Sequence, residues 1–126
     1  MKLLLDTHVL IWWLDPTLST LSKTAYDAIA DGKNLAFVSA ATAWEITIKK
    51  SLGKLDAPDN FEEELARHDF QALPITISHA LAVGELPHHH KDPFDRILVA
   101  QTKVEGLTLV TRDENMKMYD IPFIAA

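Results

Sequence analysis

Short apolar runs alternate along this chain with longer stretches in which apolar positions recur every three or four residues. The short runs are typical of buried strands, and the longer stretches are typical of helices that pack one face against a core. The pattern predicts strands at residues 3–5, 35–38, 72–75, 107–110 and 122–124. It predicts helices at residues 8–14, 22–30, 40–52, 61–68, 78–83 and 93–104. Strands that alternate with helices favour an α/β fold in which helices cover both faces of a mostly parallel sheet.

The chain has 126 residues with no repeat and no linker rich in Gly or Ser, so we expect one domain over residues 1–126. It contains no cysteine, which excludes disulfides, zinc–thiolate sites and cysteine nucleophiles. No apolar run approaches the roughly 20 residues that cross a bilayer. The apolar start stops at Asp6 without the pattern of a signal peptide. We therefore expect a soluble cytoplasmic protein.

The formal net charge of −6 changes the range of functions that this fold class could have. It argues against a protein that coats nucleic acid through a broad basic surface. It does not exclude a nuclease, because clustered carboxylates count as negative while each bound divalent cation adds positive charge locally.

Two acidic residues follow predicted strands directly. Asp6 comes after the run at residues 3–5, and Asp113 comes after the run at residues 107–110. In parallel α/β sheets, ligands bind beyond the carboxyl ends of the strands. Each residue could instead cap the helix or turn that follows it.

Glu45 lies on the predicted helix at residues 40–52. The face of this helix that we expect to be buried carries Ala41, Trp44, Ile48 and Leu52. At 100° per residue, Glu45 falls close to the centre of that face, within about 40°. A carboxylate turned toward a core is costly unless it is paired or binds a metal. The alternatives are a buried salt bridge and an edge position that reaches solvent.

The segment from Asp92 to Arg96 holds two further acids at the start of a predicted helix. Asp92 is placed to cap the helix, with Pro93 at the first helical position. Asp95 is then in the first turn, where its side chain is free to point into a site. Either residue could ligate a metal.

Asp6, Glu45, Asp95 and Asp113 together predict a metal site. Oxygen ligands without cysteine suit Mg²⁺ or Mn²⁺, and like charges held close together are unstable without a cation. Two such ions about 4 Å apart could activate a water and stabilise the leaving oxygen of a phosphodiester.

Four blocks of sequence contain these acids. The blocks run over residues 4–12, 39–55, 92–101 and 109–113, and they include Leu5-Asp6-Thr7, Trp44-Glu45-Ile46, Gly53-Lys54-Leu55, Asp92-Pro93-Phe94-Asp95-Arg96 and Thr111-Arg112-Asp113. In this order they resemble PIN-domain ribonucleases, and among these the VapC toxins of bacterial toxin–antitoxin pairs. The resemblance spans nearly the whole chain.

The resemblance implies a PIN-like three-layer α/β/α sandwich and a metal-dependent endoribonuclease that hydrolyses RNA with a metal-activated water. It implies that Asp6 and Asp95 are the principal ligands of Mg²⁺ or Mn²⁺. Glu45 would be a further acid of the pocket and Asp113 the fourth, with Thr7 and Thr111 in support. It also implies an RNA substrate, a VapB-like antitoxin and a homodimer.

Other polar and aromatic residues have simpler interpretations. His88, His89 and His90 could bind a metal, but adjacent histidines in a loop rarely share one ion, so we expect them to be exposed to solvent. The basic residues Lys49, Lys50, Arg96 and Arg112 could contact phosphate, but surface charges or partners of the acidic site are the simpler expectation. Trp12 and Trp13 point about 100° apart on one helix. Either the fold covers both rings, or this helix contacts another chain, for which it is our candidate.

Two other functions remain to be weighed. A phosphatase of the haloacid dehalogenase type needs a second Asp two residues after the first, and His8 occupies that position. A catalytically inert PIN scaffold that binds RNA or a partner is the other alternative, and the presence of all four acids counts against it.

Overall fold

The computed structural model describes residues 1–126 and is built on one sheet of five parallel strands. The strands are β1 (Lys2–Leu5), β2 (Leu35–Ser39), β3 (Gln71–Leu73), β4 (Thr108–Thr111) and β5 (Phe123–Ala125), in the order β3-β2-β1-β4-β5. In the central strand β1, Leu4 pairs with Phe37 on one side and Leu109 on the other. Residues Leu3, Leu4 and Leu5 are fully buried, as expected of a strand covered on both faces.

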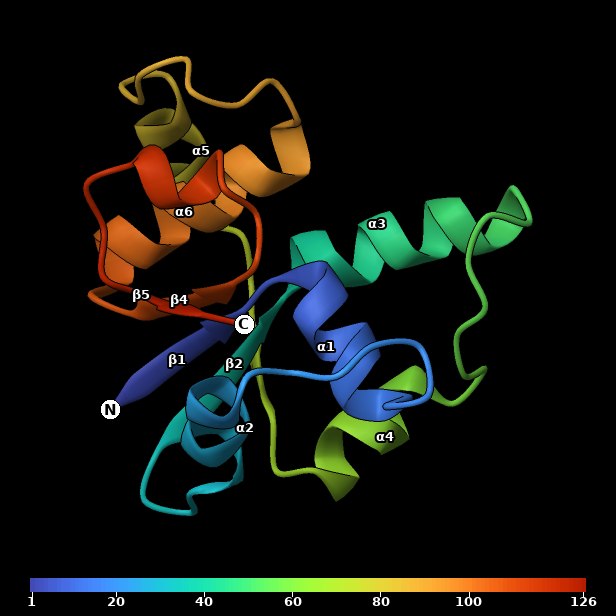
Figure 1. Ribbon diagram of the computed structural model, residues 1–126. Coiled ribbons are helices and arrows are strands. Elements are labelled where there is room, and N and C mark those ends of the chain that lie inside the picture. Colours follow the sequence, from blue (N-terminus) through green and yellow to red (C-terminus); the bar gives the residue numbers. More distant parts are fainter.

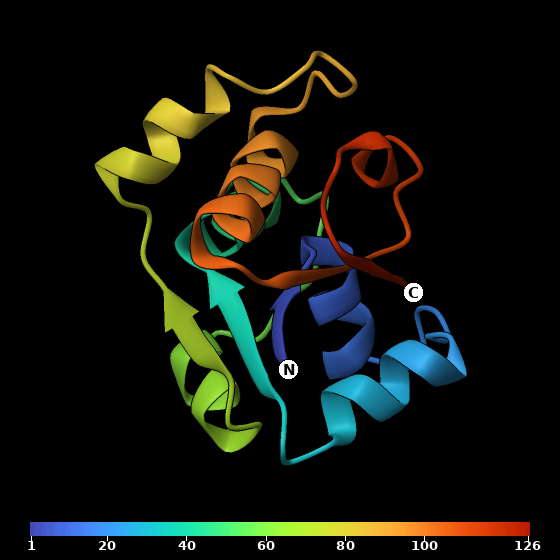
Figure 2. The ribbon, with the colours of Figure 1, turned by 90° about the vertical axis from the view of Figure 1, so that its left-hand side faces the viewer.

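Helices cover both faces of this sheet (Figure 1). The helices are α1 (Thr7–Leu14), α2 (Lys23–Ala30), α3 (Ala40–Ser51), α4 (Phe61–Arg67), α5 (Ile77–Val83) and α6 (Pro93–Glu105). Side chains of α1, α2 and α4 pack with Leu3 and Leu5 in one core, whereas α5 and α6 pack with Leu4 in a second core on the opposite face. Figure 2 shows the sheet between these two layers. The predicted α/β/α sandwich is confirmed, and the sheet is entirely parallel.

Most element boundaries agree with the sequence pattern, and the differences have local causes. Strand β3 ends at Leu73 rather than residue 75, because Pro74 has no N–H to donate to a neighbouring strand. Helix α6 ends at Gly106, whose positive φ of 65° turns the chain toward β4. A 3₁₀ helix at Met116–Met118 was not predicted as a separate element. None of the helices is long and apolar enough to cross a membrane.

Helix α3 presents a different face to the core from the one that we expected. Its buried residues are Ala41, Thr42, Glu45 and Ile46, whereas Trp44 and Leu52 are each 61% exposed. Ile48 is also exposed, so the prediction was wrong for three of the four apolar residues. The reason is that α3 leaves the sheet at the end of β2 and packs against α1 and α6. The ring of Trp44 lies edge-on against Phe94 of α6, with 5.2 Å between ring centroids.

Candidate functional site

The four predicted acids lie at the carboxyl edge of the sheet or on the helices that pack there. Asp6 follows β1 and Asp113 follows the neighbouring strand β4. Glu45 lies on α3, which begins where β2 ends, and Asp95 lies in the first turn of α6. Helix α3 contacts both α1 and α6, so the segments that hold Asp6, Glu45 and Asp95 adjoin one another.

Asp6 is a buried carboxylate held by a neighbouring strand. Its Oδ2 accepts a hydrogen bond of 2.8 Å from the hydroxyl of Thr111, the last residue of β4. Its side chain makes no capping bond to α1, so the capping alternative does not account for it. Burial raises the pKa of Asp6, although the bond from Thr111 and the nearby His8 act in the opposite direction.

Glu45 is only 3% exposed, so the prediction that it points inward is confirmed although the rest of its face was misjudged. Its Oε1 accepts a 2.7 Å hydrogen bond from the hydroxyl of Thr7, which follows Asp6 in the chain. Its Oε2 lies 2.8 Å from Nζ of Lys49, one turn later on α3. The hydrogen bond to Glu45 is the main cause of a raised pKa at Lys49. Glu45 is therefore the buried partner of a half-buried ion pair, and its charge acts on Asp95.

Asp95 has the most perturbed carboxyl group of the site. Burial, followed by the charges of Asp6 and Asp92, raises its pKa to about 7, and the charge of Glu45 acts in the same direction. The charge of His90 acts in the opposite direction on the pKa of Asp95. Carboxylates that raise one another's pKa in this way need a cation or a proton to share the space.

Asp113 has two roles, because each of its oxygens has different partners. Its Oδ1 accepts hydrogen bonds from the backbone N–H groups of Asn115 and Met116 and so caps the 3₁₀ turn, as the capping alternative predicted. Its Oδ2 lies 3.1 Å from Nε2 of His90. Burial would raise the pKa of Asp113, but the hydrogen bonds from His90 and the backbone outweigh it and the pKa is lowered.

Asp92 caps α6, as predicted. Its Oδ1 accepts hydrogen bonds from the backbone N–H groups of Phe94 at 2.8 Å and Asp95 at 3.3 Å, and Pro93 occupies the first helical position. The cap therefore fixes the first turn of α6, which carries Asp95.

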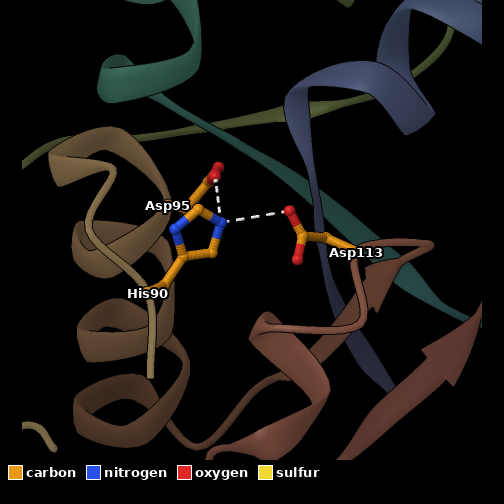
Figure 3. A group of neighbouring side chains, drawn as sticks. All are labelled: His90, Asp95 and Asp113. Atoms are coloured by element: carbon orange, nitrogen blue, oxygen red, sulfur yellow. Dashed lines mark hydrogen bonds and ion pairs between the residues drawn. The ribbon is translucent and has the colours of Figure 1, made fainter. Parts of the chain in front are cut away.

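His90 was missed by the sequence reading. His88 and His89 are exposed as expected, but the side chain of His90 is only 14% exposed. Its Nε2 lies 2.9 Å from Oδ2 of Asp95 and 3.1 Å from Oδ2 of Asp113, so the ring stands between the two carboxylates (Figure 3). The expectation of exposure was wrong for this residue. In the sequence, only its position just before the acidic segment at residues 92–96 indicates that it could belong to the site.

The basic residues that we considered for contacts with phosphate form hydrogen bonds or ion pairs within the protein. Arg96 is buried and donates to the carbonyl oxygens of Val83 and Pro87 and to the hydroxyl of Tyr119, so it is neither a surface charge nor a partner of the acids. Arg112 donates to Ser19 and to the carbonyl oxygens of Thr20 and Ala126, and its guanidinium lies 4.2 Å from the ring centroid of Trp12. Lys50 pairs with Asp59.

The ligand atoms present suit a hard divalent cation. Asp6, Glu45, Asp95 and Asp113 offer carboxylate oxygens, and the chain has no thiolate. Candidate ligand atoms of His90, Asp95 and Asp113 all lie within 4.8 Å of one another. Burial and, after it, the neighbouring carboxylates raise the pKa of Asp95 and so destabilise its charged form at the same place.

Comparison with known families agrees with this arrangement. The model of the PIN domain matches residues 3–122. The chain belongs to the PIN-domain family. It is also 32% identical over 124 residues to "Ribonuclease VapC22" of Mycobacterium tuberculosis, with 94% of this chain and 92% of the relative aligned. The resemblance to VapC-type PIN proteins that the four sequence blocks suggested is therefore confirmed.

Solved structures share the fold of this PIN protein. VapBC2 from Rickettsia felis, solved bound to a DNA fragment from its promoter, has a TM-score of 0.72 at 14% identity, covering 100% of this chain and 99% of that chain. A toxin–antitoxin complex from Klebsiella pneumoniae has a TM-score of 0.63 at 21% identity, covering 97% and 95%. At these identities the likeness concerns the fold.

Proposed function

We propose that this PIN protein is a metal-dependent endoribonuclease of the VapC type, the toxin of a toxin–antitoxin pair. The observation that carries the proposal is the group of acids at the carboxyl edge of the sheet, in which burial and neighbouring carboxylates raise the pKa of Asp95 to about 7. The 32% identical relative is named a ribonuclease, which supports RNA as the substrate. The proposed location is the cytoplasm.

We assign the cation to Asp6 and Asp95. The cation, Mg²⁺ or Mn²⁺, would supply Lewis-acid activation of a water and stabilise the developing charge on the phosphodiester. Thr111 orients Asp6 through its hydroxyl, and the cap at Asp92 orients the turn that carries Asp95. Both carboxylates are thus held before a cation arrives, which lowers the cost of assembling the site.

Glu45 is assigned to the attacking water. Thr7 holds one of its oxygens and Lys49 the other, which fixes the plane of the carboxylate. Each carboxylate oxygen has a second lone pair, so Glu45 can still accept a hydrogen bond from water and orient it toward the phosphorus. Lys49 balances the charge of Glu45 and is 38% exposed, so it lies at the boundary between the site and solvent.

A VapB-like antitoxin is the proposed protein partner, since similar folds have been solved as toxin–antitoxin complexes. Trp12 and Trp13, on the helix that we singled out for such a contact, line a hollow of about 670 Å³ together with Leu21 and Tyr26. Co-expression and co-purification with the neighbouring gene product would test the partner.

The homodimer that the family resemblance implies is tested by light scattering of the isolated chain.

Cleavage of RNA by the purified protein tests the proposed function. We expect cleavage with Mg²⁺ or Mn²⁺, none in EDTA, and a loss of at least about a hundredfold in Asp6→Asn, in which a principal ligand is neutralised. Asp56→Asn is the matched control, because Asp56 is an exposed aspartate outside the site. Full cleavage in EDTA or by Asp6→Asn would contradict the mechanism. An absence of Mn²⁺ binding in calorimetry would favour an inert PIN scaffold instead.

A further inference from the structure

We propose that His90 is a positioning residue of the acidic site, which holds Asp113 beside Asp95 by donating its Nε2–H and does not itself ligate the cation. The inference rests on the proposed metal site and adds to it a residue that is not an acid. Three features of the structure carry it: the partner of the other ring nitrogen, the geometry between the carboxylates, and the anchoring of the backbone.

The tautomer of His90 follows from its Nδ1 atom. The backbone N–H of Asp92 donates to this atom at a distance of 3.1 Å. A backbone amide can only donate, so Nδ1 must offer a lone pair and cannot carry a proton. The ring proton of the neutral imidazole is therefore on Nε2, the atom that faces the acids.

The position of Nε2 suits a donor to Asp113 that lies next to the carboxylate of Asp95. It lies 2.9 Å from Oδ2 of Asp95 and 3.1 Å from Oδ2 of Asp113 (Figure 3). The other oxygen of Asp113 is already held by the turn at Asn115 and Met116. His90 therefore joins the start of α6 to the turn after β4, which are otherwise separate segments.

Direct ligation by His90 is disfavoured by the same contacts. A histidine that binds a metal through Nε2 needs its lone pair there and normally donates its Nδ1–H to an acceptor. In this protein Nδ1 would then direct its proton at the N–H of Asp92. A cation could use His90 only if the ring left this position, whereas a donor role needs no change.

The backbone of His90 is fixed by the buried core. Its N–H donates to the hydroxyl of Tyr119 at 3.1 Å, and the same hydroxyl accepts a 3.2 Å hydrogen bond from Arg96. Arg96 also binds the carbonyl oxygens of Val83 and Pro87, at the two ends of the loop that leads to His90. The buried Arg96, which follows Asp95, therefore fixes the loop, and the loop fixes the imidazole of His90.

Three variants separate the proposed role from a structural one. In His90→Gln, the side-chain amide can still extend an N–H to the position of Nε2. In His90→Asn, the shorter amide can replace only Nδ1 as the acceptor for Asp92. His88→Asn is the matched control, because His88 is an exposed histidine in the same loop.

We expect His90→Asn to bind Mn²⁺ about tenfold more weakly in calorimetry, the scale typical of lost contacts around metal ligands. His90→Gln should remain within about threefold of the unmodified protein by the same reasoning, and His88→Asn should be unchanged. Equal Mn²⁺ affinity in His90→Asn and the unmodified protein, at equal thermal stability, would overturn the proposal.

Two spectroscopic measurements test the donor role directly. Nitrogen-15 NMR of the histidine rings, assigned by difference with His90→Gln, should show His90 protonated on Nε2 without metal and with Mg²⁺. Electron spin echo spectroscopy of the Mn²⁺ protein should show no coupling from a directly bound imidazole, and a coupling that His90→Gln removes would make His90 a ligand. If the protein binds no Mn²⁺, the proposed function fails, whereas the metal-free NMR spectrum still decides the tautomer.

Discussion

The hydroxyl of Thr111 donates to Oδ2 of Asp6 at 2.8 Å and joins the ends of two neighbouring strands. The same hydroxyl oxygen accepts a 3.0 Å hydrogen bond from the backbone N–H of Asp113. One fully buried threonine thus orients the acid after β1 and begins the turn that carries the acid after β4.

Replacing Thr111 by Val removes both bonds while keeping the shape of the side chain. We expect a loss of about 1–3 kcal/mol in the free energy of unfolding, because a buried carboxylate and a backbone N–H lose partners. Mn²⁺ affinity should fall as well, since Asp6 is no longer oriented. Urea unfolding and calorimetry measure the two effects. Thr111→Ser keeps the hydroxyl and is the control. If Thr111→Val binds Mn²⁺ as tightly as Thr111→Ser, the hydroxyl of Thr111 does not contribute to the metal site.

The raised pKa of Asp95 predicts that the affinity for a metal ion rises with pH, while the stability of the metal-free protein falls. The carboxyl group is about half protonated near pH 7 without metal, and a cation must displace that proton. The apparent Mn²⁺ affinity should therefore rise between about pH 6 and 8, with proton release. Calorimetry in buffers of different ionisation enthalpy measures the protons. Affinity that does not change over this range would contradict a raised pKa.

The same group should destabilise the metal-free protein as it ionises. Its folded pKa lies above the ordinary value of 3.8, so the stability that it contributes is complete below about pH 4 and is lost as pH rises through about 7. Asp95→Asn should flatten this dependence and melt at a higher temperature than the unmodified protein at pH 8 without metal. Added Mn²⁺ should stabilise the unmodified protein only. A lower melting temperature for the metal-free variant at pH 8 would show that burial and the neighbouring carboxylates do not destabilise the ionised Asp95.

Replacing Lys49 by Met should leave the buried carboxylate of Glu45 without its cationic partner. We expect a loss of about 1–3 kcal/mol in the free energy of unfolding, less than for a fully buried pair because the Lys49 side of the pair is 38% exposed to solvent. Lys50→Met is the matched control, since Lys50 pairs with the exposed Asp59 and should cost under about 1 kcal/mol. Denaturant unfolding at pH 7 compares the two, and equal losses would mean that Glu45 does not depend on Lys49.

The acids could be predicted from the sequence because their positions depend on local pattern. Asp6 and Asp113 follow apolar strands, and parallel strands bring their carboxyl ends to one edge. Asp92 and Pro93 form a local start signal that places Asp95 in the first turn of α6. These features need no knowledge of how distant segments pack.

Residues whose environment depends on distant packing could not be predicted in the same way. Periodicity placed Trp44 and Glu45 on the same face of α3, but only the packing of α3 against α1 and α6 decides that Glu45 is buried and Trp44 exposed. His90 belongs to a loop without periodicity. Its place between Asp95 and Asp113 depends on the hydrogen bond that its N–H donates to the hydroxyl of Tyr119, which also accepts one from Arg96. No pattern along the chain reveals these contacts.

The strand order also has a consequence for the timing of synthesis. Strand β1 is made first, yet its neighbour β4 comes late in the chain, and Asp113 and the Thr111 hydroxyl come with it. A ribosome-bound chain that ends before residue 111 contains Asp6, Glu45 and Asp95 without Thr111, which orients Asp6, and without Asp113. A hydrolase that needs all four acids would therefore be silent while it is being translated, and would gain activity only when its last segments close against the first.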